Sequence, residues 1–113
     1  MDGGAIMKPD QDILNNLVNR ILAVVKPLRI ILFGSAARGE MGPDSDLDVL
    51  VIVPDGADRK ALWEKVYLNM FGLGVAKDII VATYSEVERH RDNPFMIYHD
   101  AVKEGRELYR AAA

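Results

Sequence analysis

Two aspartates, Asp46 and Asp48, stand at the start of a run of branched aliphatic residues and are the first candidates for chemistry. Side chains in a β-strand alternate between its faces, so residues two apart point the same way. Two carboxylates about 4 Å apart repel by roughly 4 kcal/mol at an effective dielectric of 20. A divalent cation turns that repulsion into attraction, and hard oxygen ligands suit Mg²⁺. The pair therefore predicts a metal site, with a solvated acidic strand end as the plainer interpretation.

A third aspartate, Asp78, lies within an apolar segment, between Lys77 and Ile79. A charge in such a segment must be paired, solvated or bound to a metal. Lys77 cannot pair with it directly, because neighbours in a strand face opposite sides. If this strand lies beside the one that carries Asp48, the three carboxylates meet. A salt bridge to a base elsewhere is the alternative.

Gly34 and Ser35 directly follow the apolar run 28–33. A backbone that turns from a strand into a helical turn leaves N–H groups without partners, and these can bind an anion. Glycine lets a phosphate approach the main chain closely, and the Ser35 hydroxyl can donate one more hydrogen bond. Taken alone, the two residues fit an ordinary strand-to-helix turn. Together with three carboxylates, they predict a two-metal site for phosphoryl or nucleotidyl transfer.

Two similar patterns do not fit. The glycines at 34 and 39 have the spacing of a P-loop, but Glu40 and Met41 stand where lysine and serine or threonine are required. The alternating aspartates from Asp44 onward resemble an EF-hand loop, but Val49 replaces its glycine and Asp55 replaces its last glutamate.

The elements that position these residues follow from the hydrophobic pattern. Apolar residues at three- and four-residue steps predict amphipathic helices, and short branched-aliphatic runs predict strands. The order predicts an α/β (α+β) fold, a small mixed β-sheet with helices packed on it. The predicted elements are a helix from Pro9 or Asp10 to Pro27, strands over 28–33, 47–53 and 75–82, a helical turn over 35–38, and helices over 58–71, from Thr83 or Ser85 to about 91, and from Pro94 to about 105, with a last edge strand at 108–109.

In the helix over 58–71, we expect Leu62, Val66 and Met70 to face the core. Trp63 is also expected in the core rather than as a stacking platform.

Composition limits the classes of function. The chain has 113 residues, half of them hydrophobic, with no cysteine and a net charge of −3. This length predicts a single domain over residues 9–113 after a flexible tail over residues 1–8. The absence of cysteine excludes disulfides and thiolate chemistry and fits a reducing cytoplasm. No apolar run is long enough to span a membrane, no secretion signal is recognisable, and the acidic balance makes nucleic acid unsuitable as a direct partner.

The motif Phe33 to Gly39 (FGSAARG), followed after a spacer by Ser45-Asp46-Leu47-Asp48, resembles the signature of the DNA polymerase β-like nucleotidyltransferases. The short length resembles the minimal nucleotidyltransferases, the MNT or MntA-type antitoxins. The resemblance extends from about Pro9 onward. It implies a nucleotidyltransferase fold like the polymerase β palm.

The resemblance also implies roles for the residues. Gly34 and Ser35 would hold the triphosphate of ATP, with Arg38 as a further phosphate or nucleotide contact. Asp46 and Asp48 would ligate two Mg²⁺ ions. Asp78 would bind the catalytic metal and help to deprotonate the attacking hydroxyl, so that AMP is transferred and pyrophosphate leaves.

The acceptor is expected from the family alone. Larger relatives carry extra domains that bind the acceptor, and a minimal enzyme would find it on a partner. The family implies a HEPN-domain toxin that receives AMP. One alternative is an antitoxin that acts by binding alone, through a helical surface around Arg89, Arg91 and Tyr98. Another is a transferase for a small molecule or an RNA end, and the weak basic character argues against RNA.

Overall fold

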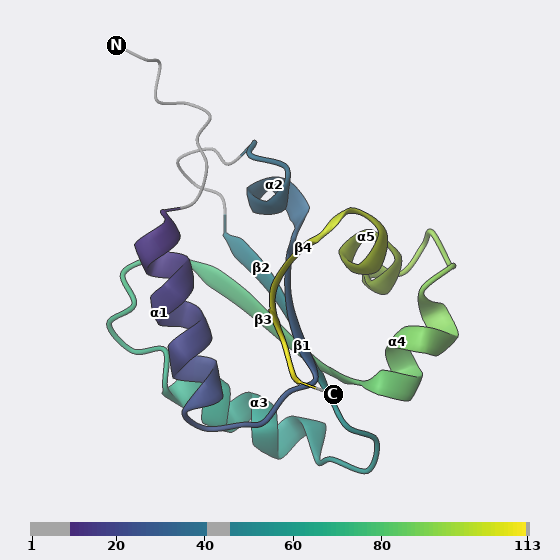
Figure 1. Cartoon of the computed structure of the whole chain (residues 1–113), viewed down its shortest axis with the longest axis horizontal. Helices are drawn as coiled ribbons and strands as arrows, with labels where there is room; N and C mark the ends of the chain where they lie inside the picture. Colours follow the sequence, from purple (N-terminus) through teal and green to yellow (C-terminus); the bar gives the residue numbers. More distant parts are fainter. Residues whose placement is uncertain (1–9, 41–45, 113) are drawn as a thin grey trace.

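The structure is a computed structural model that describes residues 10–40 and 46–112. The tail predicted over residues 1–8, and the part of the glycine-rich loop over 41–45, lie outside the described residues. Figure 1 shows a sheet with helices on both faces. In chain order the elements are α1 (Gln11–Leu22), β1 (Arg29–Phe33), α2 (Gly34–Ala37), β2 (Leu47–Val53), α3 (Arg59–Leu68), β3 (Lys77–Thr83), α4 (Tyr84–His90), α5 (Ile97–Glu104) and β4 (Arg106–Arg110).

The sheet has four strands in the order β3-β2-β1-β4. β1 pairs antiparallel with both β2 and β4, and β2 pairs parallel with β3. The predicted mixed sheet with a last edge strand is therefore confirmed. β2 is almost wholly buried because both of its faces are covered, which explains its unbroken aliphatic sequence.

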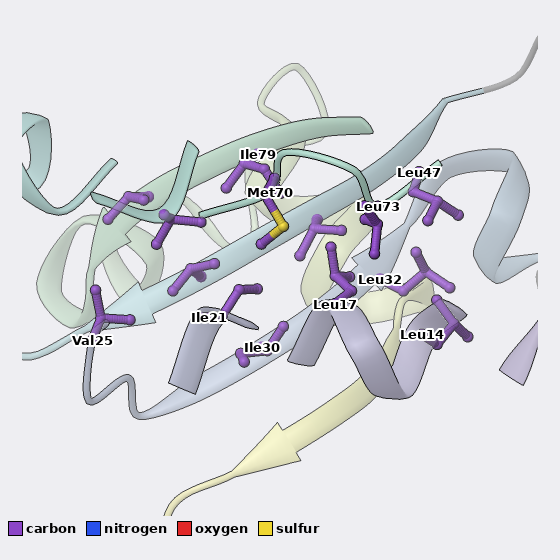
Figure 2. Close-up of a cluster of buried hydrophobic side chains, with 14 of the residues drawn as sticks. Leu14, Leu17, Ile21, Val25, Ile30, Leu32, Leu47, Met70, Leu73 and Ile79 are labelled. Carbon is purple, nitrogen blue, oxygen red and sulfur yellow. The ribbon is translucent and has the colours of Figure 1, made fainter. Parts of the chain in front are cut away.

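The two faces of the sheet feed two hydrophobic clusters. On one face, alternate residues of β2 (Leu47, Val49, Val51) pack with α1 and with Val66 of α3. Figure 2 shows this cluster, with Leu47 of β2 and the α1 side chains Leu14, Leu17 and Ile21 labelled. On the other face, the intervening residues Leu50 and Ile52 pack against α4 and α5. The strand period of two thus decides which side chains reach which cluster. Asp48, between Leu47 and Val49, belongs to the α4/α5 face.

Side chains begin three of the helices as their sequences predict. Asp10 accepts from the N–H of Asp12, and Asp58 accepts from the N–H of Ala61. Thr83 and Glu86 form a reciprocal capping box at the start of α4. Each bond satisfies a backbone donor that the helix itself cannot reach.

Two helix boundaries were predicted wrongly. α1 ends at Leu22 instead of reaching Pro27, because the backbone tightens into a turn in which the Val24 N–H bonds to the Ile21 carbonyl. Val25 is still buried. Its position in the apolar pattern therefore predicted its burial correctly, although the residue lies beyond the end of the helix. α5 begins at Ile97 instead of Pro94, with an extended Met96 before it.

Two aromatic side chains are also not where the sequence pattern places them. Trp63 is 38% exposed, stacks on Tyr67 with 5.0 Å between ring centroids, and donates its indole N–H to the Ile79 carbonyl. It is therefore not a core residue. Tyr98 is only 9% exposed and packs beneath α4, so the interface suggested around Arg89, Arg91 and Tyr98 loses its aromatic member. Within the described ranges, no helix has the length and apolar character to cross a membrane.

Gly105, between α5 and β4, offers a test of this packing. A Cβ there would lie 2.5 Å from Ile31 Cγ2 and would also collide with the Ala101 carbonyl oxygen. We predict that Gly105→Ala lowers the free energy of unfolding by about 1–3 kcal/mol through overpacking. Thermal unfolding measures this loss. The neighbouring Glu104→Ala, at an exposed position, should change stability by less than about 0.5 kcal/mol. Equal effects of the two changes would contradict the packing.

Candidate active site

The strand register brings two of the candidate carboxylates together. Asp48 of β2 is the cross-strand partner of Asp78 of β3 and, on its other side, of Phe33 of β1. Partners in register point to the same face, so these three side chains form one row across the sheet. Asp46 lies two residues before Asp48 on the exposed approach to β2. The juxtaposition of β2 and β3, on which the sequence prediction depended, is present.

Of the three acidic groups, Asp48 is the one whose ionisation responds to the other two. Burial raises the pKa of the Asp48 carboxyl above its ordinary value, and the negative charges of Asp78 and then Asp46 raise it further. Within the described part of the chain, none of the three pairs with a lysine, arginine or histidine. A group of like charges without a basic partner is the donor set that a divalent cation neutralises.

The same side chains do not form a closed metal cage. Among the described residues, no three acidic or imidazole groups are arranged to hold one ion. Mg²⁺ does not require such a cage, because it commonly takes one or two carboxylates and completes its shell with water and substrate phosphates. The residues therefore fit a Mg²⁺ site that a polyphosphate substrate completes.

Gly34 connects the predicted anion cradle to the carboxylates. Its φ of +72° lies in the left-handed region, and a Cβ there would lie 2.5 Å from Asp48 Oδ2. Only glycine combines this backbone conformation with so close an approach. The carboxylate of Asp48 consequently lies against the main chain at the point where β1 turns into α2.

Ser35, in α2, and Arg38, the residue at which α2 ends, differ in exposure and in contacts. Ser35 is half-buried, and its carbonyl accepts the Glu40 N–H, which holds the turn in place. Arg38 is exposed and donates its Nε to Glu40 Oε1 at 2.7 Å. That hydrogen bond, more than any other contact, raises the pKa of Arg38, and the charges of Glu104 and Asp100 on α5 contribute less.

The structure thus gathers Gly34, Asp46, Asp48 and Asp78, and it shows Arg38 engaged with Glu40. Sequence reasoning missed the role of Glu40. The available signal was an acidic residue two positions after the arginine, but spacing by two on a helical turn does not predict a contact. The contact occupies the Nε–H of Arg38 and offsets its positive charge, while the Nη donors have no hydrogen-bond partner among the described residues.

We predict that Asp48→Asn stabilises the metal-free protein at neutral pH. Because folding raises the pKa of this carboxyl, its ionised form opposes folding. The cost is absent below the unfolded pKa of about 3.8, grows as the pH rises through the folded value, and is complete above it. Like charges opposed across two strands cost roughly 0.2–1 kcal/mol, which corresponds to about 1–6 °C in Tm.

Thermal unfolding in EDTA measures this effect at pH 7 and at pH 3. The difference between Asp48→Asn and the wild type should be present at pH 7 and vanish at pH 3. If Asp48→Asn is instead less stable than the wild type at pH 7 in EDTA, the ionised carboxylate makes a favourable contact that outweighs its burial and its repulsion by neighbouring carboxylates.

Gly34→Ala and Gly72→Ala form a matched pair. Both glycines have positive φ, +72° and +82°, but a Cβ at Gly72 would meet nothing within 4 Å. Each change costs about 1–2 kcal/mol for the left-handed backbone, and only Gly34→Ala adds the collision with Asp48. We expect Gly34→Ala to lose about 1 kcal/mol more in chemical denaturation. Equal losses would mean that the Asp48 carboxylate moves aside freely.

Comparison with known proteins identifies the family and the fold. The sequence matches the family model described as a nucleotidyltransferase domain over residues 14–108. No protein of curated function matches the sequence.

Solved toxin–antitoxin complexes contain chains of the same fold. A complex with AMP-PNP has a chain with 23% identity and a TM-score of 0.63, over 87% of this chain and 73% of that one. A MntA–HepT complex gives 21% identity and a TM-score of 0.58, over 90% and 74%. A Shewanella oneidensis complex of tri-AMPylated HEPN toxin with MNT antitoxin gives 22% and 0.59, over 89% and 72%. At these identities the likeness establishes the fold. The family match spans most of the sequence, and the chain therefore belongs to the nucleotidyltransferase domain family.

Proposed function

We propose that this chain is a Mg²⁺-dependent nucleotidyltransferase that moves AMP from ATP onto a hydroxyl of a partner protein. The observation that carries the proposal is the register of Asp48 with Asp78 beside Gly34, because it puts a like-charge pair next to the main-chain turn from β1 into α2. Carboxylates and N–H groups together are the donors that a metal-bound triphosphate needs. The same residues make little sense as a purely structural surface, since their mutual repulsion is uncompensated.

Each residue has a distinct part in the proposed reaction. The main-chain N–H groups and hydroxyl at Gly34 and Ser35 bind phosphate oxygens, and the Nη groups of Arg38 add a contact. Asp46, Asp48 and Asp78 hold the Mg²⁺ ions, which when bound neutralise the triphosphate and the departing pyrophosphate. Asp78 accepts the proton of the acceptor hydroxyl. The hydroxyl oxygen bonds to the α-phosphorus, the bond between the α- and β-phosphates breaks, and pyrophosphate leaves.

The proposed partner is a HEPN-domain toxin, with this chain as its antitoxin. Proteins of the same fold support this choice, since one is a toxin–antitoxin complex with AMP-PNP and another holds an AMPylated HEPN toxin. The absence of cysteine is consistent with action in a reducing cytoplasm.

Incubation of the full chain with ATP, Mg²⁺ and the protein encoded by the neighbouring gene tests the proposal. Label in the α-phosphate should appear on the partner, and label in the γ-phosphate should not. Asp48→Asn and Asp78→Asn should each lower the rate by at least roughly 100-fold, as expected when charge stabilisation in a transition state is lost. Asp12→Asn, which changes an exposed carboxylate on α1, is the matched control and should retain the rate.

The same variants separate catalysis from binding. If Asp48→Asn still neutralises the toxin in cells, the chain acts by contact alone and catalysis is dispensable. If the wild type binds the partner and MgATP yet transfers no α-label, the transferase proposal is wrong.

A further inference from the structure

The outer edge of β3 has backbone groups that no neighbouring strand satisfies. In the described part of the chain β3 is the last strand of the sheet. On its inner side, the Leu47 N–H donates to the Ala76 carbonyl at 2.9 Å. Bonding direction alternates along a strand of a parallel pair, so the N–H and C=O groups of Asp78, Ile80 and Ala82 face β2. Those of the intervening residues face outward.

Two side chains confirm this alternation and leave a gap between them. Trp63 Nε1 donates to the outward carbonyl of Ile79 at 2.9 Å, and the outward N–H of Thr83 donates to Glu86 Oε1 at 3.2 Å. Between these bonds, the N–H of Ile79 and both main-chain groups of Val81 have no hydrogen-bond partner among the described residues.

A groove borders the same stretch of edge. Its volume is about 610 Å³, and it is lined by residues 57–60 at the start of α3, by Trp63 and by residues 79–81. Three strand residues offer roughly 10 Å of edge. A purely apolar ligand would leave the main-chain donors and acceptors unsatisfied. The chemistry that satisfies them is a second extended backbone, as in peptide recognition by strand addition.

We propose that the acceptor segment of the partner protein binds as an extended strand along the outer edge of β3. This inference rests on the proposed function, since it names the form in which the acceptor reaches the carboxylates. The row Phe33, Asp48, Asp78 runs across the sheet to this edge. A residue placed beside Asp78 in an added strand points to the same face, with its Cβ about 5 Å from that of Asp78. A serine, threonine or tyrosine there presents its hydroxyl to the Asp78 carboxylate.

The charges around the edge indicate the composition of the segment. Lys60 lines the groove and Lys77 begins β3, and neither is in an ion pair within the described residues. Arg59 is already paired with Glu86. An extended segment with apolar residues and flanking glutamates or aspartates complements this edge. A second copy of this chain complements it poorly, because an isologous contact brings the same lysines together.

Synthetic peptides test the proposal directly. The probes are peptides of about 12 residues, long enough for one strand, with one central tyrosine, serine or threonine, alternating aliphatic residues and glutamates at both ends. The full chain is incubated with these peptides, MgCl₂ and ATP labelled in the α-phosphate. Single N-methylation of the peptide backbone then removes one N–H at a time. We expect methylation at every second residue to lower labelling by about tenfold, and methylation at the residues between to have little effect.

A pair of protein variants tests the edge from the other side. Val81→Pro removes the outward N–H and leaves the bonds to β2 intact, because proline is tolerated where the N–H faces away from the sheet. Val81→Ala shortens the side chain and keeps that N–H. Peptide labelling should fall about tenfold in Val81→Pro relative to Val81→Ala, with MgATP binding by calorimetry the same in both. If circular dichroism shows Val81→Pro unfolded, the N-methyl series decides the question.

The outcomes separate the two proposals. A wild type that does not bind MgATP contradicts the proposed function itself. A wild type that binds MgATP but labels no peptide overturns strand addition and leaves the nucleotide site standing, as does an N-methyl series without a period of two. Labelling of an RNA end in place of the peptides would identify a different class of acceptor and also overturn it.

Discussion

The repulsion between the carboxylates on β2 and β3 is an unfavourable interaction that packing elsewhere in the structure must offset. A parallel pair in register puts Asp48 beside Asp78, and burial, followed by the negative charges of Asp78 and Asp46, raises the pKa of Asp48. Among the described residues, no basic side chain forms an ion pair with either carboxylate. The favourable free energy that holds the pair in place comes from elsewhere, from the apolar residues that follow each aspartate along its strand. The two clusters on either face of the sheet bury these residues almost completely.

The need for compensating apolar packing explains why an unbroken aliphatic run follows Asp48 in β2. From Val49 to Val53 it feeds both hydrophobic clusters alternately, and it is covered on both faces. Packing on both faces fixes the register of β2, because a slip by one residue would move every aliphatic side chain to the opposite face of the sheet. The strand can therefore hold the unfavourable charge of Asp48 near its start. The two contributions are therefore separated along β2. Asp48, at the start of the strand, belongs to the candidate site, and the aliphatic residues 49–53 contribute to stability through their packing.

The sequence predicts the candidate site residues, but it predicts less of their environment. Alternation places Asp46 and Asp48 on one face, and the aliphatic run around Asp78 predicts its strand, because strand period and burial are local properties. The parallel pairing of β2 with β3 is a non-local choice and entered only as a condition. The hydrogen bond of Arg38 with Glu40 depends on how α2 ends. Trp63 fits a helix period that points to the core, yet it lies at the margin of the sheet, since the carbonyl of Ile79 offers its indole N–H a partner there.

Trp63 lies at the outer edge of β3, and the two edges of the sheet differ in how their backbone groups are protected. An unpaired strand edge is a hazard that proteins cover or charge, and β4, at the other margin, carries the charged residues Arg106, Glu107 and Arg110. β3 has no such defence along Ile79, Ile80 and Val81, where only one carbonyl is capped. This stretch of edge belongs to the strand that carries Asp78 as its second residue. An edge left open beside Asp78, while the opposite edge is charged, is the arrangement that the proposed strand addition requires.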